Sequence, residues 1–457
     1  MTRPPVAVAR AARIMGGLSA PEGALGSATS ALSSKGEAIR SSLLEVIRRE
    51  RVLPQIVDNA RRCAALAAWL GGELPGLVAE ADHRRTIIGE LREECDTFVG
   101  NVGRDKCVIV KGLCVEKWYP SSAPRDFGDF DVVLPDGDDV WDALRVAAEM
   151  GFKIEKVRVS LGGDGQLHGI APAHKYARAG RGWVSCDIHF GGFPSIGGSV
   201  VTFEPGEVEV VLGVSGRTQR HTTPTGALIV LAAHTIRQGY ARLRELNDMR
   251  TIWNLMSRDE REHVMRRATK DGFGNILDAL CGARCSPAAR VVGALLLSGG
   301  AADKRVHGGR RVGLARVVQV LHLAAQYERE GRPGRAWRLW QEGRALWRYG
   351  RTYEVWNDVR LRTLKPGGAP VVFAMLESVP SCMSERAWMN VVEGRTGVDV
   401  ARVGARAVLI NPGRFGEVLV TPGGTFVQAA HDGTTDGALC AAAQTSVSDL
   451  VTRPSGR

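Results

Sequence analysis

The chain has 457 residues, of which 44% are hydrophobic and 24% are charged. These fractions are typical of a soluble globular protein, and the length corresponds to roughly two to four domains. No apolar run approaches the ~20 residues that a membrane-spanning helix needs, so neither a membrane protein nor a membrane partner is expected. The nine cysteines are scattered singly along the chain. We therefore expect reduced thiols and a cytoplasmic location.

The net charge of +11 is concentrated in one region. Residues 301–366 hold 15 lysines and arginines against 6 acidic residues. Such a region can contact RNA or another polyanion, and the ordinary alternative is a solvated helix face. Arginine outnumbers lysine, and alanine, glycine and valine are abundant, which is a composition common in high-GC bacterial genomes.

The hydrophobic pattern divides the chain into five segments. The first is rich in small residues and proline and is expected to be a disordered leader. A helical pattern follows, then alternating strands, then a long helical region, and finally short strands between proline and glycine turns. The expected segments are a leader at 1–37, a helical N-terminal cap at 38–103, a central segment at 104–215, a second helical segment at 216–366, and a β-rich or mixed appendage with a disordered tail at 367–457.

The most informative stretch is 106–135, KCVIVKGLCVEKWYPSSAPRDFGDFDVVLP. The pattern predicts a strand, a turn at Gly112, a short helix, a loop and a second strand. Asp129 and Asp131 lie two residues apart on the second strand, so their side chains share one face. Neighbouring carboxylates repel each other unless a cation lies between them, and Mg²⁺ prefers such oxygen ligands. A glycine at a strand-to-helix turn also lets a phosphate approach the backbone.

A third acid lies on a later predicted strand, WVSCDIHF at 183–190. Asp187 and His189 share one face of this strand, and its apolar residues alternate onto the other face. A third carboxylate beside a metal-binding pair is what phosphoryl or nucleotidyl transfer requires. It completes the second metal site or accepts the proton of the attacking hydroxyl.

These stretches together resemble a known family. The string VKGLCVEKWYPSSAPRDFGDFDVVLP, the following EMGF and the later SCDIHF are similar to the uncharacterised nucleotidyltransferase family of the DNA polymerase β-like superfamily. The helix at 224–253 resembles that family's helix with a histidine and a Leu-x-x-Asp, so the resemblance covers roughly 40–330. Leu113 departs from the superfamily pattern, in which serine or glycine commonly follows the turn glycine.

The resemblance implies an α+β fold. Its core is a polymerase β-like nucleotidyltransferase domain, with a small mixed sheet and flanking helices, at 104–215. The helical segment at 216–366 becomes a substrate- and nucleotide-binding domain, and the small C-terminal β-containing appendage stays outside the resemblance.

Carried over position by position, the resemblance assigns three carboxylates both as metal ligands and as catalytic groups: Asp129, Asp131 and Asp187. Asp187 is in addition the candidate base. The alternative for all three is an exposed acid at a strand end.

Four nucleotide-binding residues also follow from the resemblance: Lys111, Gly112, Arg125 and His189. Arg125 lies four residues before the first aspartate, where a guanidinium can pair two phosphate oxygens. His234 and Asp248 are expected to line the cleft on the acceptor side. The alternatives are a core histidine and an aspartate that pairs with an arginine of its own helix.

The implied activity is transfer of an NMP group from an NTP, with ATP as a candidate, to an acceptor hydroxyl. Mg²⁺ or Mn²⁺ is the implied cofactor, and a small molecule or biosynthetic intermediate is the expected acceptor. One alternative is a catalytically inactive binding or scaffold protein with the same fold. Another is an RNA- or protein-modifying nucleotidyltransferase, such as a toxin, in which the basic 301–366 region contacts RNA.

Overall fold

The computed structural model describes residues 11–281, apart from 13, 19, 34–36, 155, 162–165, 179–181, 196–199 and 239–240. Beyond 281 it describes residue 340 and the strands between 371 and 428. The basic region at 301–366 therefore lies outside the described residues, apart from residue 340. Among the described residues, no helix combines the length and apolarity needed to cross a membrane.

A mixed sheet flanked by helices forms the centre of the molecule, which confirms the α+β expectation. Its core order is β4-β5-β6-β2-β1-β10-β9, with β3 paired to β5. Strand β2 runs parallel to β6 and antiparallel to β1, and β1 runs parallel to β10. These strands are β1 (Val108–Val110), β2 (Asp129–Leu134), β3 (Lys153–Ile154), β4 (Lys156–Leu161), β5 (Leu167–Tyr176), β6 (Trp183–Phe190), β9 (Val208–Leu212) and β10 (Thr218–Thr222). A separate short pair joins β7 (Phe193–Pro194) to β8 (Val200–Val201).

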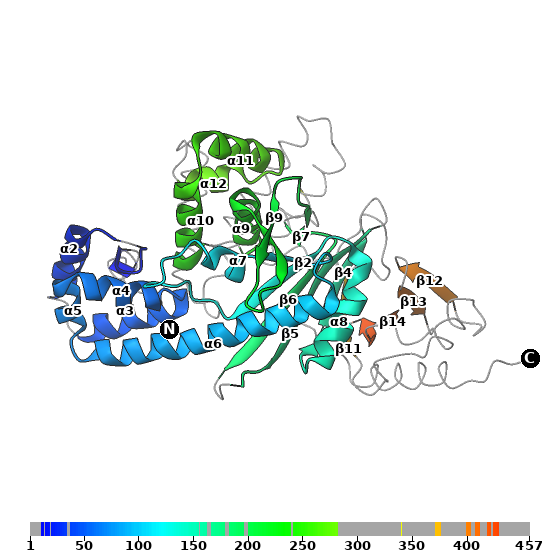
Figure 1. Cartoon of the computed structure of the whole chain (residues 1–457), viewed down its shortest axis with the longest axis horizontal. Helices are drawn as coiled ribbons and strands as arrows, with labels where there is room; N and C mark the ends of the chain where they lie inside the picture. Colours follow the sequence, from blue (N-terminus) through cyan, green and yellow to red (C-terminus); the bar gives the residue numbers. More distant parts are fainter. Residues whose placement is uncertain are drawn as a thin grey trace, which may run out of the picture.

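Alternation along β2 sends its side chains into two hydrophobic cores. Phe130, Val132 and Leu134 enter one core together with residues of α6 (Glu73–Val102) and α8 (Val140–Glu149). Val133 enters the second core, which lies against the other face of the sheet with helices α9 to α12 (Figure 1). Because Asp129 and Asp131 have the same parity as Val133, both point toward this second, helical side.

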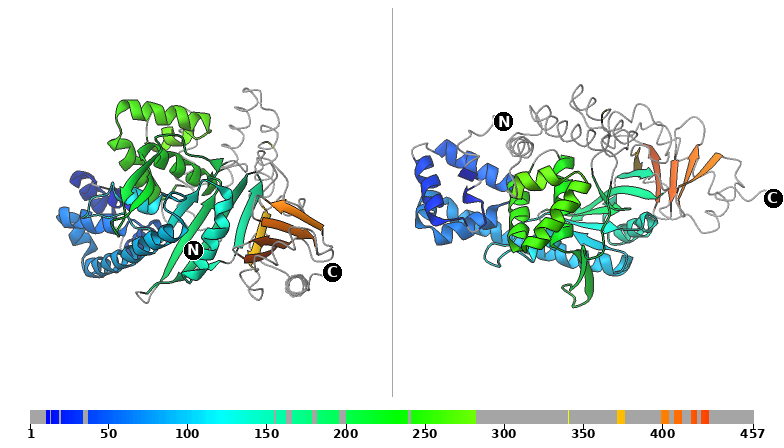
Figure 2. Two further views of the ribbon diagram at one scale, coloured as in Figure 1. Left: turned by 45° about the vertical axis from the view of Figure 1, so that its right-hand side comes forward. Right: turned by 90° about the horizontal axis from the view of Figure 1, so that it is seen from above.

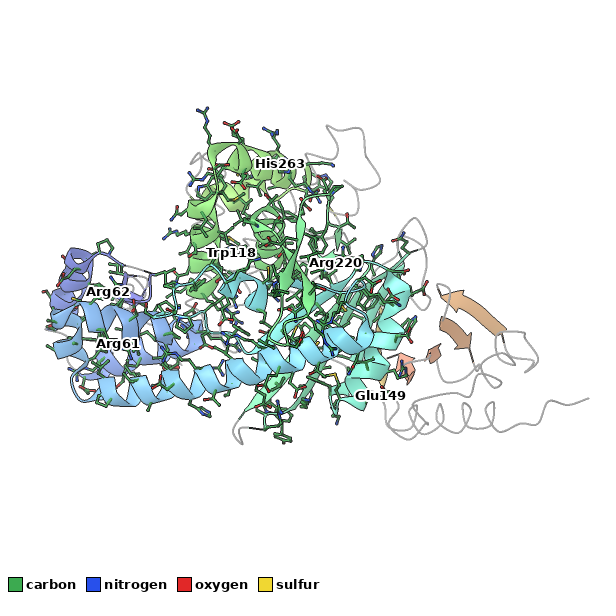
Figure 3. All side chains as sticks on the ribbon, viewed as in Figure 1. Arg61, Arg62, Trp118, Glu149, Arg220 and His263 are labelled. Atoms are coloured by element: carbon green, nitrogen blue, oxygen red, sulfur yellow. The ribbon has the colours of Figure 1, made fainter. Side chains whose placement is uncertain are left out.

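The helices on that side follow the sheet in sequence. They are α9 (Pro224–Gln238), α10 (Leu243–Leu255), α11 (Arg258–Lys270) and α12 (Gly274–Cys281). Helix α9 is buried along nearly its whole length, which matches its apolar sequence ALIVLAA. Trp118, which follows the short helix α7 (Gly112–Glu116) and is labelled in Figure 3, contacts both cores.

The N-terminal helices form a third core with the beginning of α6. They are α2 (Glu22–Ser33), α3 (Glu37–Glu50), α4 (Leu53–Arg62) and α5 (Ala64–Leu70). This unit lies beside α10 (Figure 2), and Asn247 of α10 donates from Nδ2 to the carbonyl of Gly16 at 2.8 Å. The helical cap therefore touches the helices that face the carboxylates.

The expectation of a disordered leader at 1–37 is wrong for the part of it that the structure describes. Met15 and Leu25 are fully buried, and Asn59 donates from Nδ2 to the carbonyl of Met15 at 2.8 Å. The reason is that the alanines and glycines of this segment permit close packing. A few larger residues such as Leu32 then supply the apolar area.

Two runs of helical pattern in the sequence each form two helices. The run at 55–71 forms α4 and α5, with Cys63 extended between them. The pattern at 225–256 forms α9 and α10, and Arg242 is the extended N-cap of α10. The side chain of Glu245 accepts a hydrogen bond from the Arg242 backbone N–H at 3.0 Å, so local capping starts a new helix there.

Short strands from the C-terminal segment extend the sheet. Strand β11 (Val371–Met375) pairs antiparallel with β4, and β12 (Asp399–Val403), β13 (Ala407–Asn411), β14 (Val418–Thr421) and β15 (Gly424–Gln428) continue from it. Short strands were expected in this segment, and the stretches PVVFAML, RAVLIN and EVLVTP contain β11, β13 and β14.

Candidate active site

The parallel pairing of β2 with β6 brings the second and third acids together. Asp131 is the register partner of Asp187, and Asp129 is the partner of Ser185. Adjacent strands lie about 4.8 Å apart and register partners point to the same face, so the two carboxylates are neighbours. One carboxylate oxygen each from Asp131 and Asp187 and one ring nitrogen of His189 lie within 4.8 Å of one another.

Asp131 is the most enclosed of the three acids. Its Oδ1 accepts from Lys111 Nζ at 2.5 Å and lies 3.2 Å from Nε2 of His189. Burial acts to raise the pKa of Asp131, but the Lys111 ammonium and the His189 ring outweigh burial and hold that pKa well below its usual range. Its Oδ2 is buried and has no hydrogen-bond partner among the described residues. An oxygen of this kind is available to a ligand.

The pKa of Asp187 is shifted in the opposite direction. Burial and then the charge of Asp131 raise its pKa to about 7, and Asp129 acts in the same direction. The three acids therefore resist simultaneous ionisation unless a cation joins them. Two carboxylates and an imidazole form a donor set that suits a divalent ion, so these residues fit the metal that the sequence leads us to expect.

Asp129 lies at the open side of the group. Its side chain is 37% exposed, and its Oδ1 lies 3.9 Å from Nη1 of Arg51. Burial and Asp131 act to raise its pKa, yet the cations of Lys111, Arg244 and Arg51 leave it lowered. Asp129 is thus an ionised carboxylate that a ligand can reach.

The turn before α7 is strained at an unexpected position. The sequence suggests Gly112 as the residue that needs conformational freedom, but the positive φ of 54° falls on Lys111. Gly112 is needed for space instead, because a Cβ there would lie 3.1 Å from Nη1 of Arg125 and 3.2 Å from Phe127. A non-glycine residue in the left-handed region costs of order 1–3 kcal/mol, and such strain clusters at functional sites.

This geometry agrees with a comparison against protein families. A family model described as an uncharacterised nucleotidyltransferase matches residues 40–283, which is more than half of the chain. The chain belongs to this family. It is therefore a transferase, and its general reaction is nucleotidyl transfer. No curated protein and no solved structure matches the chain.

The matched region of this nucleotidyltransferase contains every site residue expected from its sequence. His189 lies at the carboxylates, with its ring 4.5 Å from that of Phe193. Burial lowers the pKa of His189 to about 4, so the imidazole is neutral near pH 7. A neutral imidazole can serve as a ligand or as a hydrogen-bond partner.

Arg125 occupies a different environment from the one expected. Its Nε and Nη2 donate to the two carboxylate oxygens of Asp248 at 2.8 and 2.7 Å, and Tyr119 donates from its hydroxyl to the same carboxylate at 2.7 Å. Arg125 and Asp248 are both almost completely buried. Only Nη1 of Arg125 lacks a hydrogen-bond partner among the described residues, and it lies against Gly112. Asp248 therefore joins α10 to the loop before β2.

His234 lies on α9 behind the carboxylate group. Its ring is 6.3 Å from that of Phe193, which separates it from His189, and its Nε2 lies 3.4 Å from Glu245. Burial lowers the pKa of His234 to about 4. The structure therefore places His234 one side chain away from the acids rather than among them.

Three further arginines, which the sequence did not point to, act on the acids of this nucleotidyltransferase. Arg51 and Arg244 act on Asp129, and the charge of Arg237 acts on Asp187. Arg237 lies one helical turn after His234, so a helical projection would have found it. No sequence signal marks the other two, because they come from α10 and from the turn between α3 and α4.

Proposed function

We propose that this nucleotidyltransferase moves an NMP group from an NTP to an acceptor hydroxyl, with Mg²⁺ or Mn²⁺ held by Asp129, Asp131 and Asp187. The observation that carries the proposal is the register of Asp131 with Asp187, which brings a buried and a half-buried acid side by side and is accompanied by a pKa of about 7 for Asp187. When bound, a divalent ion supplies a positive charge for the phosphates and for the attacking oxygen.

In this reaction the acceptor oxygen bonds to the α-phosphorus of the NTP. The bond from that phosphorus to the oxygen bridging the β-phosphate breaks, and pyrophosphate leaves. The hydroxyl proton passes to a carboxylate, and we assign this role to Asp187 because a base is most effective when its pKa lies near the working pH.

Four residues are proposed to hold the nucleotide: Lys111, Gly112, Arg125 and His189. The Lys111 ammonium already lies at the carboxylates, so a phosphate bound there would meet it directly. Gly112 is proposed to contribute its backbone N–H at the start of α7, while the space of its missing side chain is taken up by Arg125 and Phe127. Arg125 can contribute through Nη1 alone, since its other donors are engaged by Asp248.

The acceptor is proposed to be a small molecule or biosynthetic intermediate that enters on the side of α9 and α10. His234 remains a candidate for this wall, whereas Asp248 supports the wall through Arg125. An inactive scaffold is disfavoured because a decayed site has no need of three clustered acids with a buried lysine. The RNA-modifying alternative depends on the basic region at 301–366, outside the described residues.

The test is incubation with each labelled NTP, Mg²⁺ or Mn²⁺, and cell extract, with wild type compared with Asp129→Asn. This variant is suitable because the Asp129 side chain is 37% exposed and its nearest cation is 3.9 Å away, so the fold should tolerate the change. Asp82→Asn is the matched control, since Asp82 is an exposed aspartate on α6. We expect label transfer by wild type and the control and its loss in Asp129→Asn. Equal transfer by all three proteins would count against the proposed site.

A further inference from the structure

Two arginines from elements far apart in the sequence act on Asp129. Arg51 follows α3, and its Nη1 lies 3.9 Å from Oδ1 of Asp129. Arg244 lies in the first turn of α10, and its charge acts on both Arg51 and Asp129. The two positive charges oppose each other, since the charge of Arg244 lowers the pKa of Arg51, and an anion bound against both would relieve this repulsion.

The contacts of Arg244 leave it poorly satisfied. Its side chain is 8% exposed, and its Nε has no hydrogen-bond partner among the described residues. Its other nitrogens reach only the Asp126 carbonyl at 3.5 Å and the Glu245 carboxylate at 3.9 Å. The carboxylate of Asp126 is engaged by Arg84 at 2.6 Å. A buried guanidinium with contacts this long has free capacity for an anion.

One hydrogen bond fixes the two arginines in place. Glu50, buried at the end of α3, accepts from the backbone N–H of Leu243 at 2.9 Å. Arg51 and Arg244 are the next residues on the two sides of this contact. Arg51 also has a φ of 54°, and Lys111 is the one other non-glycine among the described residues with a positive φ. Both strained residues thus flank the same carboxylates.

Gly128 makes room for the Arg51 head group. A Cβ at this position would lie 2.7 Å from Nη1 and 3.0 Å from Nη2 of Arg51. The guanidinium therefore lies directly on the backbone before Asp129. Any side chain at 128 would push it away from the carboxylates.

The arginines are not needed to hold the N-terminal helices against the core. Gln55 donates to the Pro124 carbonyl at 3.0 Å, Asn247 donates to the Gly16 carbonyl at 2.8 Å, and Glu50 binds α10 as described. A purely structural role at this boundary would therefore not explain why a buried Arg244 and a partly exposed Arg51 lie beside Asp129.

We propose that Arg51 and Arg244 form the binding site for the polyphosphate tail of the nucleotide, so that the N-terminal helical cap completes the active site. This inference rests on the proposed function, since it names residues that hold the same substrate. Arg51 and Arg244 take the role that the sequence suggested for Arg125. Planar guanidinium groups suit the paired oxygens of a di- or triphosphate.

The test measures binding of inorganic tripolyphosphate, and of an NTP analogue with a non-cleavable α,β bridge, to Arg51→Gln and Arg244→Gln by calorimetry. We expect roughly tenfold or greater loss of affinity for both probes in each variant, because a charge-assisted hydrogen bond is lost. Arg48→Gln is the matched control, since Arg48 lies on α3 just before Arg51 and pairs with Glu80 at the surface. It should bind both probes as wild type does.

Gly128→Ala is a second variant that changes no charge. It should displace the Arg51 head group and weaken tripolyphosphate binding, while the melting temperature stays close to that of wild type. Arg51 is one-third exposed, so its variant keeps the test decisive even where Arg244→Gln does not fold. Wild-type affinity for tripolyphosphate in folded Arg51→Gln would overturn the inference.

The two proposals fail separately. Label transfer by wild type, together with unchanged tripolyphosphate affinity in the arginine variants, would remove the arginine site and leave the enzyme. Arginine-dependent tripolyphosphate binding without any label transfer would keep the anion site and remove the proposed reaction.

Discussion

Lys111 donates from Nζ to Oδ1 of Asp131 at 2.5 Å, and both side chains are buried. The ammonium thus provides a positive charge at the position where the acids converge. A divalent ion bound by the same acids would take over part of this role. The extent to which a metal ion replaces the Lys111 charge can therefore be measured through the free energy of unfolding.

Replacing Lys111 with methionine should destabilise the metal-free protein by about 3–5 kcal/mol, because it leaves a buried carboxylate with too little positive charge. Addition of Mn²⁺ should recover more stability in this variant than it adds to wild type. For wild type, Mn²⁺ at 100 times its Kd should add about 2.7 kcal/mol. Urea unfolding with and without Mn²⁺ measures both quantities.

Lys175→Met is the control for this experiment. Lys175 pairs with Glu94 at 2.7 Å, also largely buried, but away from the acids of β2. This variant should lose stability without any additional rescue by Mn²⁺. Equal rescue of wild type and Lys111→Met would show that Lys111 does not stand in for a cation.

The Arg125–Asp248 pair should contribute to the stability of the fold as well as to the active site. Removing either partner, as in Arg125→Met or Asp248→Asn, should cost about 3–5 kcal/mol because a buried charge loses its partner. The double variant should cost clearly less than the sum of the single changes. A double-mutant cycle by urea unfolding measures the coupling, and strict additivity would contradict the bidentate geometry.

Two glycine-to-alanine substitutions should change the free energy of unfolding in opposite directions. A Cβ at Gly169 would lie 1.9 Å from the Arg158 carbonyl and 2.4 Å from Phe190, so Gly169→Ala should cost about 1–3 kcal/mol or more. Gly89 lies within α6 with nothing near its Cβ position, so Gly89→Ala should stabilise by about 0.5–1 kcal/mol. Thermal melts of the two variants provide the comparison. A destabilised Gly89→Ala would contradict the packing described around α6.

His221 should make stability fall in acid. Burial lowers its pKa to about 4, from an ordinary value near 6.5. Between these two pH values, His221 is protonated in the unfolded chain but neutral in the folded chain. The stability that the neutral, buried His221 contributes is fully present above pH 6.5 and is lost as the pH falls toward 4.

The measurement is urea unfolding of wild type and His221→Gln at pH 7.5 and 4.5. The variant should lose less stability between the two pH values, by roughly 2–3 kcal/mol. His263→Gln is the control, because the side chain of this histidine on α11 is exposed. Identical pH dependence in all three proteins would mean that His221 is not buried as described.

Local periodicity was sufficient to predict the faces of the key strands. Alternation in DFDVVL put Asp129 and Asp131 on one face, and alternation in WVSCDIHF put Asp187 and His189 on one face; the register of β2 with β6 agrees with both. The resemblance carried by 106–135 and 183–190 also predicted the α+β class and the family, and both are confirmed. These features depend on residues close together in sequence.

Local periodicity did not predict the folded part of the leader or the breaks between helices. Leu25 and Leu32 are buried by α5 and its neighbours, and no periodic signal within 1–37 reveals such long-range contacts. The break before α10 depends on a cap formed by Glu245, within a sequence that is otherwise helical in pattern. Tertiary contacts outweighed local composition in the leader, whereas a local cap that the helical pattern did not reveal produced the break before α10.

The sequence by itself determined which acids share a strand face, because side-chain direction follows from backbone geometry alone. Only the tertiary structure decided that Asp131 lies opposite Asp187, that Arg125 pairs with Asp248, and that Arg51 reaches Asp129. The physical reason is that charges pair across space after hydrophobic burial has brought distant elements together. A position in the sequence does not specify which cation will lie beside which acid.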